Sequence, residues 1–352
     1  MWHFVLLIAC AAVIYLSCEW FVNAVEWLGR RLKVGPMAVG TILAAFGTAL
    51  PESVVTFVAV VFGTNAEAKN IGVGAAMGGP LALATIAYAV TGWMMLSQRR
   101  RRSLAAAAVG GGGAHQGDTA GPGPDSSDDL GDVRKLGRDQ TWFLVIFVVK
   151  VALGLVAFAF KPWLGLLFFA AYGVYFWREM RGGGEHDAAD ELAPLLMQRR
   201  RSSPQTWAVV TQTLVTLAVI FGASHLFVAQ LDAVGPMLGL PAAVTALLLS
   251  PIATELPEIM NAIIWVRQGK TALALANISG AMMIQATVPS GLGLLFTPWR
   301  FDGPLLISGL ITIAAILYLL GVWQLGRLNA KTLSLAGLFY VAFAACLIPV
   351  LT

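Results

Sequence analysis

Long apolar blocks separated by shorter polar stretches dominate the pattern of this chain. The blocks contain about 20 residues each, the length that a helix needs to cross a hydrocarbon core roughly 30 Å thick. We expect about ten transmembrane helices, at residues 3–28, 35–62, 69–96, 141–160, 162–178, 206–230, 236–266, 271–296, 303–325 and 332–351. The pattern therefore predicts an all-α membrane protein.

Two stretches fall outside this pattern, at residues 97–139 and 179–205. Both combine glycine runs with clustered charges, a composition typical of disordered linkers. We assign no chemistry to them. They divide the chain into spans 1–3 within residues 1–96, spans 4–5 within 141–178, and spans 6–10 within 206–352.

Composition and charge agree with a membrane location. The chain is 58% hydrophobic and only 12% charged, which excludes an ordinary soluble domain of its length. Its net charge of +4 comes from basic residues in loops beside apolar spans, so anionic lipid headgroups are expected partners rather than nucleic acid. Most of these residues follow odd-numbered spans, as do Arg99–Arg102 and Arg199–Arg201. The positive-inside rule then predicts a multi-pass cell-membrane protein with both termini outside and both linkers in the cytoplasm.

An internal repeat relates the two halves of the chain. Residues 21–54 align without a gap with residues 227–260, which pairs Glu52 with Glu258. Because five spans separate the equivalent helices, the second copy enters the membrane from the opposite side. This arrangement predicts two inverted five-helix repeats, whose transport site lies at the midplane where the halves meet.

Each repeat carries a Pro-Glu pair near the middle of an apolar span. The pairs are Pro51-Glu52 in span 2 and Pro257-Glu258 in span 7. A proline removes the hydrogen bond to the carbonyl four residues earlier, so we expect helices 2 and 7 to be broken here. The freed carbonyls would belong to Gly47 and Ala253, and a dehydrated cation can satisfy such groups at membrane depth.

Oxygen ligands accompany each pair. Thr48 and Thr254 lie one helical turn before the glutamates, so hydroxyl and carboxylate share a face. A glutamate in the middle of a membrane costs several kcal/mol unless it is paired or protonated. Its occurrence at repeat-equivalent positions indicates a cation site built from both halves.

These motifs resemble the sodium/calcium exchanger (cation/calcium antiporter) superfamily, whose alpha repeats carry a G-T-S-x-P-E type motif. The matching segments are Gly47 to Glu52 and Ala253 to Glu258. The resemblance implies that Glu52 and Glu258 are the central ligands, with Thr48 and Thr254 beside them. It also places Asn277 and Gln285 at ligand positions of the helix that follows the second motif.

The chain departs from the family pattern at several of these positions. Family serines are replaced by Ala49, Gly79 and Ala281, and the closing Asn or Asp of the first repeat is replaced by Leu83. Glu255 adds a carboxylate at the position equivalent to Ala49. The site is thus expected to be asymmetric, with more charge in the second repeat.

The resemblance implies a secondary active cation antiporter, not an enzyme, that works by alternating access without a cofactor. Its transported cations would be calcium, sodium or protons. A sodium/proton exchanger is the nearest alternative, and a non-transporting degenerate scaffold is another because family ligands are missing. An intramembrane enzyme would need an H-E-x-x-H motif or a serine dyad, and none of the four histidines forms such a pair.

Glu255 is the most distinctive residue of the predicted site. Two carboxylates three residues apart in low dielectric cannot cheaply be ionised together, so Glu255 and Glu258 should share a proton until a cation binds. Alternatively, Glu255 pairs with Lys150 or Gln285 and only braces the helix. The transported ion, the stoichiometry, the oligomeric state and the roles of Glu19, His225 and Lys150 stay open at this point.

Overall fold

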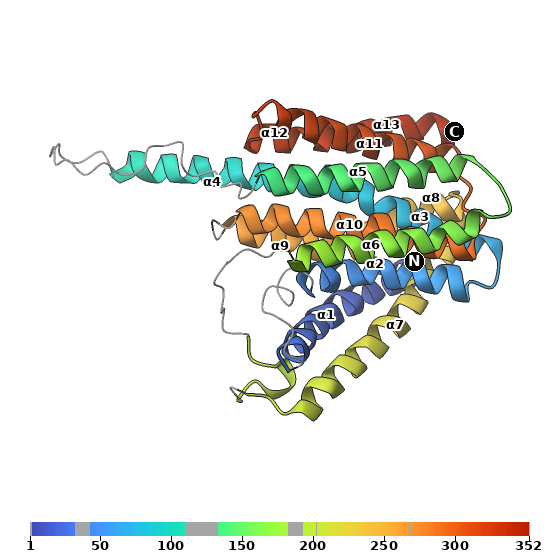
Figure 1. The fold of residues 1–352 in the computed structure, drawn as a ribbon, viewed down its shortest axis with the longest axis horizontal. Helices are drawn as coiled ribbons and strands as arrows, with labels where there is room; N and C mark the ends of the chain where they lie inside the picture. Colours follow the sequence, from blue (N-terminus) through green and yellow to red (C-terminus); the bar gives the residue numbers. More distant parts are fainter. Residues whose placement is uncertain are drawn as a thin grey trace.

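The computed structural model describes residues 2–31, 43–109, 133–181, 193–201, 203–267, 269 and 271–351. Every regular element in these residues is helical, which confirms the predicted all-α class (Figure 1). Six helical stretches are long and apolar enough to cross a membrane: Trp2–Phe21, Ala66–Arg101, Thr206–Met237, Ala274–Phe296, Gly303–Gln324 and Ala330–Val350. Shorter apolar helices occur at Ala49–Phe62 and Ala242–Ile252. The ten-span layout and the inverted repeats remain predictions.

The helices follow one another along the chain with short connections inside each half. Their bounds are α1 (Trp2–Arg31), α2 (Leu43–Phe62), α3 (Ala66–Ala82), η2 (Leu83–Ala87), α4 (Tyr88–Val109), α5 (Val133–Leu155), η3 (Lys161–Leu164), α6 (Gly165–Arg181), η4 (Leu196–Gln198), α7 (Thr206–Met237), α8 (Ala242–Thr254), α9 (Leu256–Arg267), α10 (Thr271–Phe296), α11 (Gly303–Gln324), α12 (Ala330–Leu335) and α13 (Gly337–Leu351). Helix α3 passes through the π-helical turn η2 into α4 without a loop.

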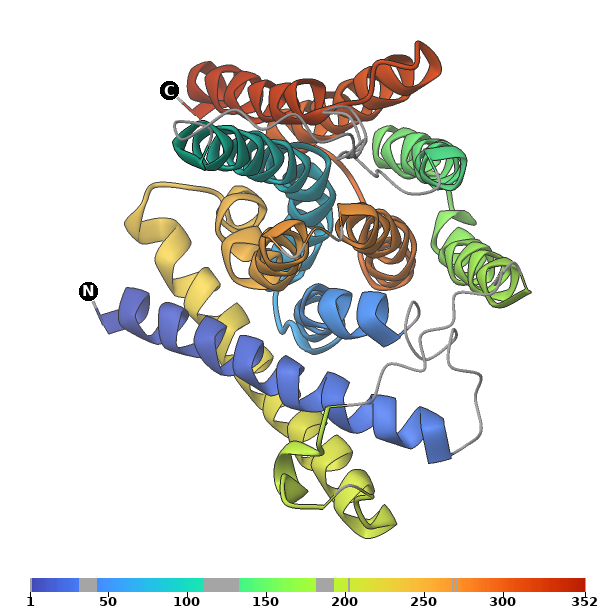
Figure 2. The same ribbon diagram turned by 90° about the vertical axis from the view of Figure 1, so that its left-hand side faces the viewer.

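The helices form a bundle with one oblique pair against it. Helices α1 and α7 pack along each other and cross the direction of the remaining helices (Figures 1 and 2). Within the bundle, α3 packs on α8 and α10 packs on α2. Helix α2, which carries Pro51-Glu52, thus lies against α10, and α9, which carries Pro257-Glu258, lies against α4. These contacts bring the two halves of the chain together.

The structure corrects the predicted break in helix 2. Helix α2 continues through Pro51 to Phe62. A proline removes only one backbone hydrogen bond, and membrane helices tolerate it where neighbouring groups satisfy the local carbonyls. Within the same helix, the Ser53 hydroxyl donates to the carbonyl of Ala49 over 3.0 Å. In the second half the helix is interrupted at Glu255, between α8 and α9.

The linker boundaries also differ from the prediction. Helix α4 continues to Val109, well inside the expected linker 97–139, and α5 begins at Val133. The basic run from Arg99 to Arg102, which was expected to belong to a disordered linker, is therefore helical. Residues 110–132 and 182–192 lie outside the described residues.

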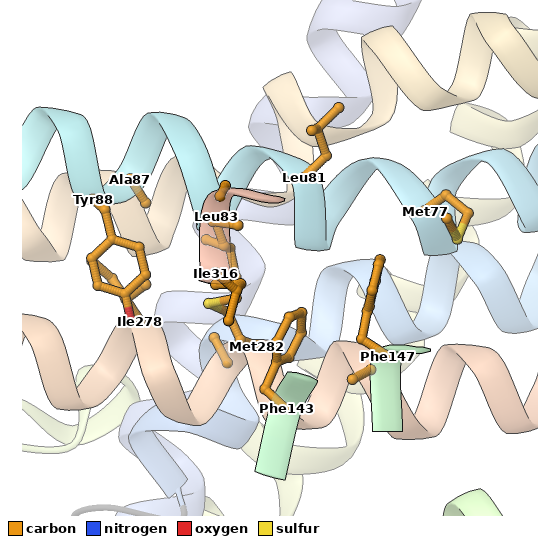
Figure 3. Close-up of a cluster of buried hydrophobic side chains, with 14 of the residues drawn as sticks. Met77, Leu81, Leu83, Ala87, Tyr88, Phe143, Phe147, Ile278, Met282 and Ile316 are labelled. Atoms are coloured by element: carbon orange, nitrogen blue, oxygen red, sulfur yellow. The ribbon is translucent and has the colours of Figure 1, made fainter. Parts of the chain in front are cut away.

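A large apolar core fixes α3, α4, α5, α10 and α11 against one another. Figure 3 shows part of it, where Tyr88 of α4 and Phe143 of α5 lie near Met282 of α10. Phe143 and Phe147 stack with ring centroids 5.1 Å apart. Helix α5 packs on α10 and α11, and the side chain of Lys150 extends from α5 to α3.

The contact between α3 and α8 depends on small residues. A Cβ atom added to Gly74 would lie 2.0 Å from the carbonyl oxygen of Ala243, closer than any real contact. We expect Gly74→Ala to force the two helices apart and to lower stability by about 1–3 kcal/mol. Thermal unfolding in detergent measures this effect.

Gly222→Ala on α7 is the matched control, because no atom lies within 4 Å of its added Cβ. That variant should unfold at or slightly above the wild-type temperature, since alanine favours a helix over glycine. Equal unfolding temperatures for Gly74→Ala and the wild type would contradict the described α3–α8 packing.

Candidate functional site

Two buried carboxylates meet at the interruption between α8 and α9. Glu52 projects from α2, Glu255 stands at the interruption itself, and both have no exposed surface. Glu255 has φ −94° and ψ −5°, a sparsely populated backbone region in which many active-site residues occur. The break thus places a charged side chain where a regular helix would have continued.

The hydroxyl of Thr254 joins these carboxylates. Its Oγ1 lies 2.7 Å from Oε2 of Glu52 and 3.1 Å from Oε1 of Glu255. The carbonyl of Ser250 lies 3.1 Å from the same hydroxyl, and Ser250 Oγ lies 3.5 Å from Oε2 of Glu52. Because Glu52 belongs to the first half and Thr254 to the second, this contact links the two halves of the chain.

Gln285 of α10 holds Glu255 from the other side. Its Nε2 donates to both carboxylate oxygens of Glu255, over 2.9 and 2.8 Å. The pair needs the space beside Gly79 of α3, since an added Cβ there would lie 2.7 Å from Oε1 of Gln285 and 2.9 Å from Oε1 of Glu255. The glycine that replaces a family serine therefore accommodates the glutamine–glutamate pair.

Two oxygen atoms of this cluster are buried without a hydrogen-bond partner, Oε1 of Glu52 and Oε1 of Gln285. Asn277, eight residues before Gln285 on α10, also has both side-chain polar atoms buried without a partner. Leaving a buried acceptor unsatisfied costs about 1–3 kcal/mol, so such atoms indicate a function that supplies a partner. A dehydrated cation is a partner that carboxylate and amide oxygens can bind.

The two carboxylates alone would not supply all the ligands of a bound cation. The described residues contain no group of three or more His, Cys, Asp or Glu side chains able to hold a metal ion. A cation bound between Glu52 and Glu255 must therefore also use neutral oxygens. Thr254 and Gln285 supply such oxygens within the same cluster.

The structure brings together four of the residues predicted from sequence: Glu52, Thr254, Glu255 and Gln285. Glu258 is fully buried in the first turn of α9, where the positive end of the helix dipole favours a carboxylate. Gly47 lies in α2, whereas the side chains of Thr48 and Ala253 lie outside the described part of the chain.

Ser250 is a residue that the sequence reasoning missed. It lies one helical turn before Thr254 and faces the same carboxylate. The i, i+4 spacing to a motif threonine was the signal that could have identified it. Gln285 is the partner of Glu255, which is one of the two pairings that the bracing alternative predicted. The cation-site role of Glu255 stays a prediction.

Comparison with known proteins places the chain among cation exchangers. The family model described as "Sodium/calcium exchanger protein" matches residues 2–180 and 208–348. The sodium/calcium exchanger MaX1 of Methanosarcina acetivorans is 28% identical over 146 residues, which cover 40% of this chain and 40% of that protein. The match therefore spans less than half the length of this relative.

Two solved structures share the fold. The H+/Ca2+ exchanger CAX superimposes with a TM-score of 0.67 at 16% identity, over 98% of this chain and 86% of that chain. The sodium-calcium exchanger NCX_Mj gives a TM-score of 0.57 at 16% identity, over 98% of this chain and 97% of that chain. At this level of identity the similarity concerns the fold.

The glutamine–glutamate pair can be tested by itself. Gln285→Met keeps the volume of the side chain but removes both donors to Glu255, so we expect a loss of about 1–3 kcal/mol in stability. Ser290→Ala on the same helix is the control, because the Ser290 hydroxyl is buried without a hydrogen-bond partner. Unfolding in detergent should separate the two variants, and equal unfolding would rule out a stabilising role for the pair.

Proposed function

We propose, from the premise that the chain belongs to the sodium/calcium exchanger protein family, that it is a secondary active antiporter of calcium. It is a multi-pass membrane protein, and the family and fold neighbours are exchangers rather than enzymes. The coupling cation in this proposal is sodium or the proton. The two ions would occupy one buried site in turn as the halves of the chain expose it to alternate sides.

The Thr254-centred cluster of Glu52, Thr254, Glu255 and Gln285 is the observation that carries this proposal. It lies in the bundle centre, is fully buried, and combines two carboxylates with unpaired acceptor oxygens. Calcium binds six to eight oxygen atoms, typically from carboxylates, carbonyls and water. The cluster supplies carboxylate, hydroxyl and amide oxygens from α2, α8 and α10, so a bound cation would tie the two halves together.

Alternating access follows from that link. A cation that binds Glu52 and Glu255 together contacts both halves, and its charge offsets the cost of holding two carboxylates in low dielectric. In an empty site that cost would be uncompensated. The conformational change that exposes the site to the other side of the membrane would therefore be slow in the empty protein. Exchange of one cation for another, rather than leakage of a single ion, is the expected behaviour.

The hydroxyl of Thr254 has more acceptor neighbours than hydrogens to donate, and this favours a proton as one of the exchanged ions. A hydroxyl has one hydrogen to donate, yet Oγ1 of Thr254 lies within hydrogen-bond distance of three acceptor oxygens. A proton on Glu255 would turn its 3.1 Å contact into a hydrogen bond donated to Thr254. Calcium binding would then displace this proton.

We expect Glu52→Gln to lower calcium exchange in proteoliposomes by more than about 100-fold, because the amide keeps the shape but loses the ligand charge. Glu258→Gln should also abolish exchange if the second glutamate of the repeat serves the same cycle. Glu67→Gln is the control, since Glu67 is an exposed acid in the first turn of α3. Wild-type exchange by Glu52→Gln, in correctly inserted protein, would refute the shared site.

Proton coupling has a separate test. Calcium affinity of the wild type should rise with pH, because a proton on Glu255 competes with the cation. Glu255→Ser removes that competition and restores the residue type of the family motif, so its calcium affinity should vary less with pH while some exchange persists. An identical pH profile in the variant would remove Glu255 from proton coupling and leave sodium as the proposed coupling ion.

A further inference from the structure

A fully buried lysine lies near the carboxylate cluster. Lys150 is on α5 and has no exposed surface. Its Nζ donates to the carbonyl oxygen of Ala76 on α3 over 2.7 Å and lies 4.9 Å from the ring centroid of Phe147. A lysine is rarely buried so completely without a specific electrostatic reason.

The position of Ala76 relates Lys150 to the site. Ala76 lies one turn before Gly79 on α3, and Gly79 is the residue against which Gln285 and Glu255 pack. Lys150 therefore reaches α3 one helical turn from the residue that packs against the carboxylate cluster. Within the described residues, however, no carboxylate lies within ion-pair distance of Lys150, so the lysine does not occupy the place between Glu52 and Glu255.

We propose that Lys150 is a tethered cation of the transport site, which supplies positive charge near the carboxylate cluster and thereby limits the charge that transported cations must bring. The inference rests on the proposed antiporter function and adds a specificity-determining residue to it. The ammonium is covalently attached and held by Ala76, so it stays in the protein while the transported ions come and go. Its effect is to weaken the binding of divalent cations relative to monovalent ones.

The direction of the change in calcium affinity distinguishes an electrostatic role of Lys150 from a structural one. If Lys150 acts by repelling the transported cation, a neutral replacement raises calcium affinity, because repulsion in a poorly screened interior is removed. If Lys150 only anchors α5 to α3, a replacement loosens the site and lowers both stability and calcium affinity. The two roles therefore predict opposite changes in one measurement.

The experiment is equilibrium calcium binding to the purified full-length protein, compared for the wild type, Lys150→Gln and Lys150→Met. Glutamine retains an N–H donor that can serve Ala76, whereas methionine removes both donor and charge. Lys161→Gln is the control, because Lys161 is also buried but donates to the carbonyls of Val156 and Trp299. A parallel titration with sodium reports on the balance between divalent and monovalent ions.

We expect calcium affinity to rise on the order of tenfold in both Lys150 variants, with a smaller change for sodium and none for Lys161→Gln. Unchanged or lower calcium affinity in Lys150→Gln, with wild-type unfolding temperature, would overturn the proposal. A loss confined to Lys150→Met would assign an anchoring role and also overturn it. If the wild type binds neither calcium nor sodium, the proposed antiporter function fails and this inference fails with it.

Discussion

The cost of holding carboxylates in a low-dielectric interior governs the centre of this protein. Glu52 comes from the first half of the chain, and its principal partner, the hydroxyl of Thr254, comes from the second. Neither half could bury its charge as cheaply alone, because an unpartnered carboxylate at this depth costs several kcal/mol. The close packing of α3 on α8 and of α10 on α2 brings these groups within reach. Folding and the proposed ion binding therefore depend on the same contact.

The residues that differ from the family motif contact one another in this structure. Gly79 leaves a space that a serine side chain would fill, and Gln285 uses that space to hold Glu255. Glu255 in turn adds a second carboxylate beside Glu52 through Thr254. In the proposed site, amide and carboxylate oxygens of the second half thus offset the oxygen ligands that the first half lacks.

Hydrophobic pattern alone identified an all-α membrane protein, because a span of apolar residues has few other solutions in a bilayer. The Pro-Glu pairs singled out Glu52, which contacts Thr254 of the second half. The break that they predicted in helix 2 was wrong, because α2 continues through Pro51. Whether a proline breaks a membrane helix depends on which neighbouring groups satisfy the carbonyl that it leaves without a donor, and sequence spacing does not reveal these. Lys150 was visible as a charge inside a span, but its contact with Ala76 joins residues 74 positions apart and required the fold.

The most direct test of this account is calcium movement into proteoliposomes that contain only the purified protein, with sodium and proton gradients imposed separately. The account predicts that at least one of these gradients drives calcium uphill and that collapsing it stops the movement. It also predicts that calcium without any opposing cation moves slowly, since the empty site resists the change of sides. Absence of gradient-driven calcium movement by folded, inserted protein would contradict the account.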